Sequence, residues 1–299
     1  MNILVTGGNG QVGFELQREL SLLGTVMAPT RDSLDLLDES AVDRWLAHHA
    51  PDLVVNAAAF TAVDKAEAAP EQARRLNAEL PAQLAEYSAA RGQWFVHYSS
   101  DYVYPGGGDT PWQEDDATGP LSVYGLTKLE GDQAVQSMGG DHLIFRTSWV
   151  YSARGANFMK TMLRLGRERD ALKVVSDQIG APTPARLIAQ ITALTLYQRL
   201  VMPAPDSLPP HGVYHLAPTG ETSWQGFARE IFHQAMARGE SLAITPESVA
   251  PIPTVDYPTP AQRPLNSRLS CRKLEQALGI TLPHWRDQLA LTLAEHLNS

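Results

Sequence analysis

The chain has a single cysteine, Cys271, among its 299 residues, and it has no long hydrophobic run. One thiol excludes an internal disulfide and a zinc site made of cysteines. No stretch approaches the roughly 18 consecutive apolar residues of a membrane-spanning helix. The apolar start of the chain also meets glycine too early for a signal peptide. We therefore expect a cytoplasmic protein that does not enter a membrane.

Basic residues are also few. The 24 Lys and Arg residues stand against 33 Asp and Glu, the net charge is -9, and no Lys/Arg-rich run occurs. This balance argues against nucleic acid as a partner. Charged residues at 19% and hydrophobic residues at 43% are typical of a globular protein. The length exceeds that of one usual hydrophobic core and predicts two domains, or one domain with an appended lobe.

Short apolar runs alternate with helical patterns through the first half of the chain. Strands are expected at residues 3–6, 26–28, 53–56, 94–99 and 142–147. Helices are expected at residues 11–23, 40–48, 70–91 and 123–136. This β-α-β-α-β order predicts an α/β fold with a doubly wound parallel sheet of the Rossmann type.

The pattern changes after about residue 150, where proline becomes frequent and strands become scarcer. Residues 172–176 are expected to add one more strand to the sheet, and later helices are expected near residues 224–238 and 285–297. We predict a dinucleotide-binding domain and a smaller α+β C-terminal substrate lobe. The domain comprises residues 1–150 and about 169–200, and the lobe comprises about 151–168 and 201–299.

A glycine-rich turn follows the first expected strand. Gly7, Gly10 and Gly13 suit a strand-to-helix turn that bends tightly, brings backbone amides to a pyrophosphate and lets the helix pack against the strand. The stretch from Gly8 to Gly13 also fits the shorter G-x-G-x-x-G spacing, so the pattern leaves the spacing open. Either spacing predicts a dinucleotide at this turn.

The end of the second expected strand bears on the choice between NADPH and NADH. A site for NAD usually has an acid there, whereas this chain has Thr30 followed by Arg31. A guanidinium group at this place binds a 2'-phosphate, so we predict NADPH. NADH stays the alternative, because Asp32 could turn inward. Four more residues are expected near the adenosine: Asp35, Leu36, Ala58 and Ala59.

Tyr124 and Lys128 stand four residues apart in an expected helix, so both lie on one face of it. The helix begins after the strand that ends near Ser100, and strand ends are where an open α/β sheet places its site. A carbonyl that accepts a hydride needs a proton, and a phenol with a pKa near 10 supplies it readily only beside a cation. We predict Tyr124 as the proton donor and Lys128 as that cation, which also binds the nicotinamide ribose.

A neighbouring hydroxyl is expected to donate a hydrogen bond to the substrate carbonyl. Strand alternation puts Ser99 and Ser100 on opposite faces, and we assign the role to Ser100. In the second half, Arg263 and Arg268 suit the diphosphate of a nucleotide sugar, although solvated loop arginines are an equal alternative. Trp149 either stacks on a base or sugar or belongs to the core.

With these residues in place, the sequence resembles the extended short-chain dehydrogenase/reductase superfamily, and within it the dTDP-4-dehydrorhamnose reductase family. The resemblance runs nearly end to end. It is carried by residues 6–13, 55–64, 98–104, 124–128, 145–151 and 263–267. It implies NAD(P)H-dependent reduction of the 4-keto group of dTDP-4-dehydro-L-rhamnose to dTDP-L-rhamnose. This is the last step of dTDP-rhamnose synthesis, which supplies cell-surface polysaccharides such as the O-antigen of lipopolysaccharide.

The resemblance also implies roles for single positions. Tyr124, Lys128 and Ser100 would be the catalytic residues. The cofactor would contact Gly10, Gln11, Val12, Ala59, Phe60 and Thr61. The dTDP-sugar would contact Ser100, Asp101, Trp149, Asn157, Arg263 and Asn266.

Some members of that family form homodimers through magnesium held by glutamates. Glu15 and Glu295 match such ligands, but Arg186 stands where another acid is expected. The resemblance therefore implies a homodimer as a candidate assembly and argues against a magnesium bridge in this chain.

Two other classes of protein share the fold. A nucleotide-sugar epimerase or dehydratase would retain NAD tightly, and a dehydratase would need an acid-base pair where Ser100 and Asp101 offer one acid. A non-catalytic nucleotide-binding regulatory subunit would have no use for the Ser100, Tyr124 and Lys128 set. We expect the reductase.

Overall fold

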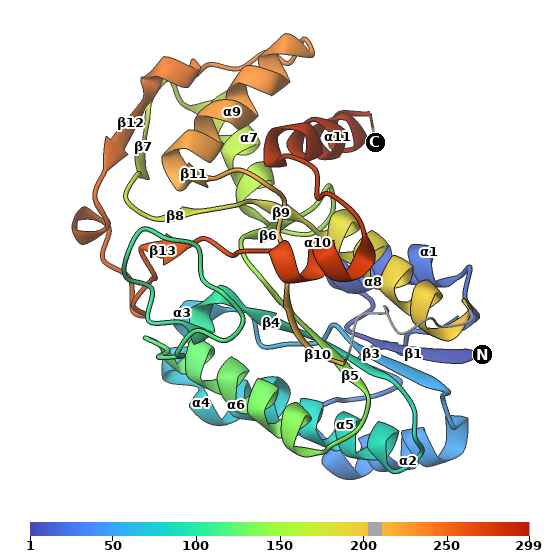
Figure 1. Cartoon of the computed structure of the whole chain (residues 1–299). Helices are drawn as coiled ribbons and strands as arrows, with labels where there is room; N and C mark the ends of the chain where they lie inside the picture. The colour runs from blue at the N-terminus through green and yellow to red at the C-terminus, as the bar shows by residue number, and fades with distance from the viewer. Residues whose placement is uncertain (203–210, 299) are drawn as a thin grey trace.

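The structure is a computed structural model, which describes residues 1–202 and 211–298. Residues 203–210, which belong to the expected C-terminal lobe, and Ser299 lie outside the described residues. At the centre stands a parallel sheet of six strands in the order β10-β5-β4-β3-β1-β2 (Figure 1). The strands are β1 (Asn2–Thr6), β2 (Thr25–Met27), β3 (Leu53–Asn56), β4 (Phe95–Ser100), β5 (His142–Thr147) and β10 (Gly212–His215).

The strand order reverses at β1, which has β2 on one side and β3 on the other. The predicted doubly wound sheet of the Rossmann type is confirmed. The helix that leads into β2 and the helix that leads into β3 lie on opposite faces of the sheet. A crevice therefore opens beyond the carboxyl ends of the strands. The site described below lies in this crevice.

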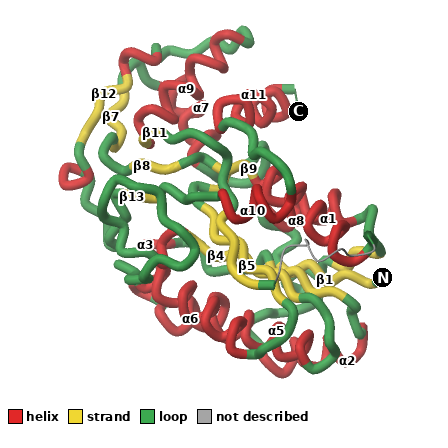
Figure 2. The backbone as a smooth tube through the Cα atoms, viewed as in Figure 1, coloured by secondary structure: helices red, strands yellow, loops and turns green. Residues whose placement is uncertain are grey.

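Helices cover both faces of the sheet (Figures 1 and 2). One face carries α1 (Gln11–Leu20), α8 (Ala185–Leu200) and α10 (Arg272–Leu278). The other carries α2 (Glu39–His49), α4 (Pro70–Arg74), α5 (Leu80–Ala89) and α6 (Val123–Ser137). Because both faces are covered, the strands are continuous apolar runs rather than alternating ones.

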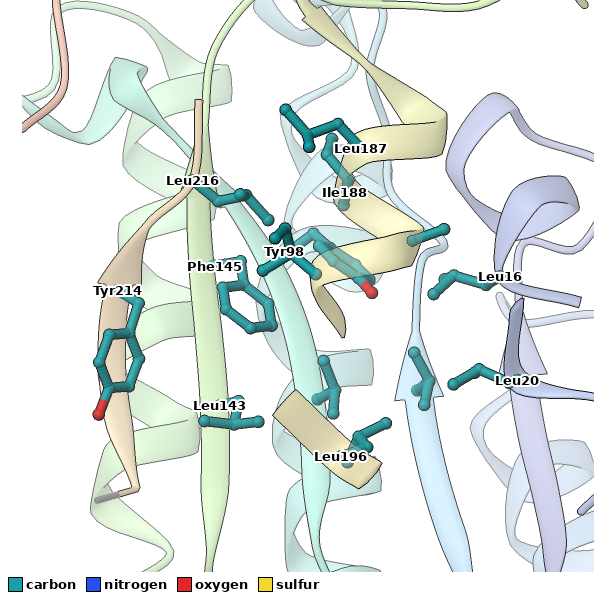
Figure 3. Packing of buried hydrophobic residues seen from close by; sticks show 14 of the residues in the cluster. Leu16, Leu20, Tyr98, Leu143, Phe145, Leu187, Ile188, Leu196, Tyr214 and Leu216 are labelled. Carbon is teal, nitrogen blue, oxygen red and sulfur yellow. The ribbon is translucent and has the colours of Figure 1, made fainter. Parts of the chain in front are cut away.

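The core beneath α1 and α8 holds the two helices on the sheet. Leu16, Leu20 and Ile188 belong to one buried cluster with Tyr98 and Phe145 of the strands (Figure 3). Burial of each such side chain contributes roughly 2 kcal/mol of hydrophobic stabilisation. This packing holds the start of α1 at the carboxyl end of β1.

The helix expected over residues 70–91 is interrupted. Between α4 and α5 the chain forms a π-helical turn, η1 (Arg75–Glu79). Pro81 has no N–H group for the carbonyl of Asn77, four residues earlier, which accounts for a break in the α-helical ladder at this place. A shorter helix, α3 (Val63–Ala68), precedes α4.

A second core lies in the C-terminal half. Phe227, Phe232 and Trp285 pack with Met159 and Tyr151. They come mostly from three helices, α7 (Phe158–Glu168), α9 (Trp224–Ala237) and α11 (Trp285–Leu297). Small strands and 3₁₀ turns complete this half: β6 (Val150–Tyr151), β7 (Leu172–Val175), β8 (Ile179–Gly180), β9 (Thr183–Pro184), β11 (Thr222–Ser223), β12 (Val249–Ile252), β13 (Asn266–Ser267), η3 (Pro246–Ser248) and η4 (Thr254–Asp256).

One expectation about the sheet is wrong. Residues 172–176 do not join it, because β7 pairs with β12 in a separate two-stranded sheet. The central sheet instead ends with β10, which pairs with β5. Both β10 and α10 pack with the first core, although the expected lobe includes them. A short strand beside a proline-rich stretch carries little sequence signal, and pairing with β5 decides its place. In the described part of the chain, no helix is long and apolar enough to cross a bilayer.

Candidate active site

A cavity of about 850 Å³ opens at the carboxyl ends of the central strands. Its volume lies within the usual range of cofactor and ligand sites. Most of the predicted site residues line it: Gly7, Gly10, Gln11, Val12, Thr30, Arg31, Asp35, Leu36, Ala58, Ala59, Thr61, Ser100, Asp101, Tyr124, Lys128, Trp149 and Asn157. Among the residues that line it, the sequence analysis did not single out Tyr102, Thr147 and Trp224.

The glycine-rich turn lies at one end of the cavity. Gly7 has φ of 67°, and a Cβ atom there would lie 2.8 Å from the Ala57 carbonyl. A Cβ atom at Gly13 would overlap the carbonyl oxygen of Gly7. Gly13 therefore serves the packing of α1 against β1 and does not itself line the cavity. In this turn the left-handed conformation belongs to Gly7, which favours the spacing that starts there.

The N-terminus of α1 suits a phosphate group. Its N-cap residue, Gly10, gives no side-chain hydrogen bond, and the first turn holds no acid. The free N–H groups and the positive end of the helix dipole face the turn. The residues present therefore fit the diphosphate of a dinucleotide.

The adenosine end of the cavity lies beyond β2. Ser33 donates a hydrogen bond to the Thr30 carbonyl at 2.9 Å, and the Leu37 N–H donates to Asp35 Oδ1 at 3.1 Å. These bonds shape the loop that carries Arg31. The Arg31 side chain is exposed and makes no hydrogen bond or ion pair with another described residue. It is available for a ligand.

Helix α6 presents Tyr124 and Lys128 to the middle of the cavity. The Ser122 hydroxyl caps the helix by accepting from the Gly125 N–H at 3.2 Å. A Cβ atom at Gly125 would overlap the carbonyl oxygen of Tyr102, and one at Gly131 would overlap that of Asn77. These glycines let α6 lie directly against η1 and the 3₁₀ turn η2 (Asp101–Val103).

Tyr124 lies beside Ser100. Burial raises the pKa of the Tyr124 phenol above its ordinary value, and a hydrogen bond with Ser100 opposes the rise. Ser100 also donates to Asp101 Oδ1 at 3.0 Å and accepts from the Tyr102 N–H at 3.2 Å. The ring of Tyr102 stands edge-on to that of Tyr124, with centroids 5.3 Å apart.

Lys128 is 1% exposed. Its Nζ donates to the carbonyl oxygen of Tyr98 at 2.6 Å and lies 3.2 Å from Nε2 of His97. Burial lowers the pKa of Lys128 to about 8, and the charge of Asp132 opposes the fall. Burial likewise raises the pKa of Asp101 to about 6, and the hydrogen bond from Ser100 limits the rise. Displaced pKa values of this kind cluster at functional sites.

Two hydroxyls beside these groups support a polar ligand. Ser99 Oγ and Thr147 Oγ1 are buried at the cavity wall and have no hydrogen-bond partner among the described residues. Buried polar groups are normally paired. A ligand that offers hydrogen bonds, such as the amide and ribose of a nicotinamide cofactor, would satisfy them.

Tryptophan side chains close the far end of the cavity. Trp149 has φ of 50°, an uncommon conformation for a bulky residue, and its ring stacks on Trp224 with centroids 3.8 Å apart. Trp224 donates from Nε1 to Gln178 Oε1 at 3.1 Å. Backbone strain of this kind persists where the surroundings enforce it, and it recurs at ligand sites.

Asn157 joins the two halves of the molecule. Its side-chain oxygen accepts from the Lys160 N–H at 3.1 Å and caps α7. Its Nδ2 donates to Gln11 Oε1 at 2.9 Å, at the first residue of α1. Ser152 donates to the same oxygen at 3.1 Å. The loop before α7 therefore lies against the glycine-rich turn.

Five residues predicted to contact a ligand do not line the cavity: Gly13, Phe60, Arg263, Asn266 and Arg268. Arg263 donates to Asp64 Oδ2 at 2.7 Å and to the Tyr102 hydroxyl at 3.1 Å. Asn266 is 1% exposed and donates to the carbonyls of two loop residues at the Gly-rich segment 106–110. Arg268 pairs with Glu221 at 2.6 Å. Their contacts with a substrate stay predictions.

Phe60 is held through its backbone. Asn77, in the π-helical turn, accepts from the Phe60 N–H at 2.8 Å and donates to its carbonyl at 3.2 Å. The same Nδ2 group donates to Thr127 Oγ1 at 3.1 Å. Asn77 thus ties residues 57–61 to α6. Nothing in the helical pattern around Asn77 indicated this role.

Glu15 and Glu295, the candidate magnesium ligands, are engaged with arginines. Arg186 lies 3.5 Å from Glu15 and 2.9 Å from Glu295, and Arg18 lies 3.7 and 3.6 Å from the same acids. Guanidinium groups neutralise both carboxylates, so this set does not fit a divalent cation. The described residues contain no cluster of three or more His, Cys, Asp or Glu side chains that could hold a metal.

A phenol in the middle of a cavity that suits a dinucleotide also suits hydride transfer to a carbonyl, because the alkoxide that forms needs a proton. The fold and the cavity define the protein as a nicotinamide-dependent oxidoreductase, as predicted. A family model described as the RmlD substrate binding domain matches residues 1–298. The chain belongs to this family.

Relatives of known function agree with this assignment. The chain is 47% identical over 290 residues to the dTDP-4-dehydrorhamnose reductase of Escherichia coli strain K12, covering 96% of this chain and 95% of that protein. A solved dTDP-4-dehydrorhamnose reductase from Clostridium acetobutylicum superposes with a TM-score of 0.90 at 35% identity, covering 100% of both chains. The dTDP-4-dehydrorhamnose reductase of Bacillus anthracis, solved in complex with NADP, has a TM-score of 0.87 at 30% identity, covering 98% of this chain and 99% of that one.

Proposed function

We propose that the protein reduces the 4-keto group of dTDP-4-dehydro-L-rhamnose to dTDP-L-rhamnose with NAD(P)H. The observation that carries this proposal is the continuity of one cavity. It runs from the glycine-rich turn, past Ser100, Tyr124 and Lys128, to the stacked pair of Trp149 and Trp224. The 47% identity to the Escherichia coli reductase, over 96% of this chain, supports the same substrate.

The bound nicotinamide supplies the hydride, and the residues of the chain handle the oxygen. The Tyr124 phenol gives its proton to the oxygen at carbon 4 as negative charge develops there. Because burial raises its pKa, the phenol is fully protonated before the reaction. Ser100 lies beside it, and its hydroxyl, turned from Asp101 toward the reacting oxygen, would stabilise the developing charge and afterwards the phenolate.

Lys128 supplies the cation that makes this proton transfer favourable. It sits one helical turn from Tyr124 on the same face of α6, with its amine buried at the cavity wall. In the proposed complex it binds the nicotinamide ribose, and its charge stabilises the phenolate of Tyr124. No metal ion is needed for either role.

We propose NADPH as the preferred cofactor. The adenosine end offers the free guanidinium group of Arg31 and the hydroxyl of Thr30 where an acid would repel a 2'-phosphate. NADP in the Bacillus anthracis relative supports the same choice. Gly7, Gly10 and the start of α1 would hold the diphosphate.

The far end of the cavity would bind the sugar nucleotide. Asp101 and Trp149 would contact the sugar, and Asn157, which lines the cavity, would lie close to both ligands. Arg263 and Asn266 would reach the dTDP group only after changes in their present hydrogen bonds. In this proposal the carboxyl ends of the central sheet bind the cofactor, and the C-terminal lobe binds the substrate.

The proposed location is the cytoplasm, and the proposed assembly is a homodimer. A cytoplasmic location agrees with the single cysteine, which leaves no internal disulfide to form. A homodimer is the assembly that membership of this family suggests, and sedimentation velocity of the purified protein would test it.

The first experiment follows NADPH absorbance with purified protein, dTDP-4-keto-6-deoxyglucose and the 3,5-epimerase that converts it, and repeats the assay with NADH. Oxidation coupled to dTDP-L-rhamnose formation, and faster with NADPH, is expected. Binding of exchangeable NADPH without oxidation would reject the reductase in favour of a regulatory subunit. Tightly retained NAD that is regenerated in each turnover would instead indicate an epimerase or dehydratase.

A further inference from the structure

A histidine that the mechanism does not use lies behind the catalytic lysine. His97, on β4, is 0% exposed, and its Nε2 lies 3.2 Å from the Lys128 amine. Its ring lies parallel to that of Phe95, with centroids 6.2 Å apart. Burial, and then the charge of Lys128, lower the pKa of His97 well below its ordinary value. His97 is therefore neutral, with one ring proton to place.

A chain of hydrogen bonds decides where that proton lies. The Ala58 N–H donates to Thr6 Oγ1 at 3.3 Å, and the Thr6 hydroxyl donates to Asn56 Oδ1 at 2.6 Å. Asn56 Nδ2 then faces His97 Nδ1 at 3.1 Å. An amide nitrogen can only donate, so Nδ1 of His97 accepts and the ring proton is on Nε2.

The opposite orientation of the Asn56 amide satisfies fewer groups. Asn56 would then donate to Thr6, whose oxygen already accepts from the Ala58 N–H. The Thr6 hydroxyl proton would lose Asn56 Oδ1 as its acceptor, although Thr6 is 1% exposed. Unpaired buried donors are costly. The hydrogen bonds therefore favour donation in one direction, from Thr6 of β1 through Asn56 of β3 and His97 of β4 to Lys128 of α6.

The Nε2 proton of His97 consequently points at Lys128. An ammonium group has no lone pair to accept it, whereas an uncharged amine has one. The uncharged amine can accept from His97 while it donates to the Tyr98 carbonyl, the bond present at 2.6 Å. Burial of Lys128 acts in the same direction.

One charged group near α6 opposes this effect. Asp132, on α6, favours the ammonium form of Lys128, but it pairs with Arg146 of β5 at 2.9 Å. The remaining titratable groups of α6 and of the elements packed against it are Asp64, Lys65 and Glu67 of α3, Arg74 and Glu71 of α4, Arg75 and Glu79 of η1, Glu86 and Tyr87 of α5, Tyr98 of β4, Asp101 and Tyr102 of η2, Tyr124 and Glu130 of α6, and His142 of β5. Of all these groups, Asp132 is the one whose charge acts on the Lys128 pKa.

We propose that His97 is a positioning residue that favours the uncharged amine of Lys128 in the free enzyme, so that binding of the cofactor is coupled to proton uptake by Lys128. The proton passes from the buffer to Nζ when the cofactor binds. The cofactor stabilises the ammonium form of Lys128 beside the ribose. An N–H bond forms on Nζ, the buffer acid loses the proton, and no bond between heavy atoms changes. The inference rests on the proposed role of Lys128 in binding the cofactor.

The test is calorimetric titration of NADPH into the full-length enzyme at about pH 8.5 in buffers of different ionisation enthalpy, which counts the protons taken up. The wild type is expected to take up a large fraction of one proton. In His97→Gln the side-chain amide can present its oxygen to the ammonium group, so Lys128 is charged beforehand and uptake falls toward zero. The pH at which affinity declines should rise by about one unit, a tenfold change in the proton affinity of Lys128.

A second variant tests the same coupling by moving the ring proton of His97. In Asn56→Asp a carboxylate would attract the ring proton to Nδ1, leaving Nε2 as an acceptor for the ammonium group of Lys128. Uptake should fall here too. His142→Gln is the matched control, because His142 is a buried β5 histidine whose Nδ1 meets only the Gly140 carbonyl. Uptake in His142→Gln should equal that of the wild type.

The outcomes separate this inference from the proposed function. Lys128→Met should weaken NADPH binding and abolish uptake. Unchanged affinity in Lys128→Met would reject the role of Lys128 itself. Weakened binding in that variant, together with wild-type uptake in folded His97→Gln and Asn56→Asp, would reject the coupling alone. A merely structural role of His97 would lower the melting temperature and leave proton uptake unchanged, so thermal denaturation accompanies each titration.

Discussion

The two ends of the cavity are constructed differently. At the proposed cofactor end, the groups that line the cavity are backbone amides and small residues placed by strand ends, such as Gly7 and Ala58. At the sugar end they are large side chains on loops and helix starts, such as Trp149 and Trp224, each positioned by contacts with distant segments. A site made of consecutive residues can be recognised in a sequence, whereas a site assembled from separate segments depends on packing.

Removal of the proton donor should have the largest effect. In Tyr124→Phe, kcat should fall by about 10²–10⁴-fold, because general acid catalysis is lost, while the dissociation constant of NADPH stays unchanged. Stopped-flow reduction and fluorescence titration measure the two quantities. Tyr102→Phe is the control, since that ring lies edge-on to Tyr124 and its hydroxyl accepts from Arg263. Turnover at the wild-type rate in Tyr124→Phe would reject the mechanism.

The sugar end should respond separately from the cofactor end. Trp224→Ala removes the ring that stacks on Trp149, an interaction of up to about 1.5 kcal/mol beyond area burial. We expect the KM for the sugar nucleotide to rise about tenfold with the KM for NADPH unchanged. Trp45→Ala provides the control, because Trp45 also stacks on a neighbouring ring, that of His49, but does not line the cavity. Equal changes in both KM values would show that the two ends are not independent.

A smaller change is expected at the adenosine end. Arg31→Ala should raise the KM for NADPH about fivefold and leave that for NADH unchanged, because an exposed charge pair contributes about 1 kcal/mol. Initial rates with both cofactors measure the ratio. Arg44→Ala, an exposed arginine of α2 that pairs only weakly with Asp38 at 3.9 Å, should alter neither value. A parallel rise for NADH would contradict a contact with the 2'-phosphate.

The smallest effect concerns the contact between the two cores, where Glu15 of α1 and Glu295 of α11 share Arg186. EDTA or magnesium should leave the melting temperature of the wild type unchanged, because guanidinium groups already neutralise both acids. Arg186→Glu should lower the melting temperature, and magnesium should restore part of it in that variant alone. A magnesium-dependent shift in the wild type would show that the arginines do not replace the metal.

The cofactor end was largely predictable. Gly7 and Gly10, Tyr124 with Lys128, and Ser100 lie within short motifs whose spacing has a direct structural meaning, and all of them line the cavity. For Arg263 the sequence left a diphosphate contact and a solvated loop as equal alternatives; it donates to Asp64 at 2.7 Å, and its contact with a substrate stays a prediction. An arginine in a loop has several acids within reach, and its choice among them is a matter of tertiary packing.

Other features left no local trace. Asn77 lies inside an apparent helix, and its role depends on the π-helical turn before Pro81 and on the approach of α6. His97 is a single histidine in an apolar strand, where a satisfied core residue is the ordinary interpretation. Its meeting with Lys128 joins residues 31 positions apart. The strand β10 was missed because its pairing with β5 outweighs its weak local preference for a strand.

The sequence by itself determined the parallel sheet, the glycine-rich turn at its reversal and the helix that carries Tyr124 and Lys128. Periodic apolar runs and short motifs are local, and local preferences suffice to specify them. Only the tertiary structure decided the stacked tryptophans, the arginines between Glu15 and Glu295, and the hydrogen bonds that reach Lys128 through His97. These depend on contacts between segments far apart in the chain, whose energies are comparable to those of many alternative pairings, so they are settled when the whole core closes.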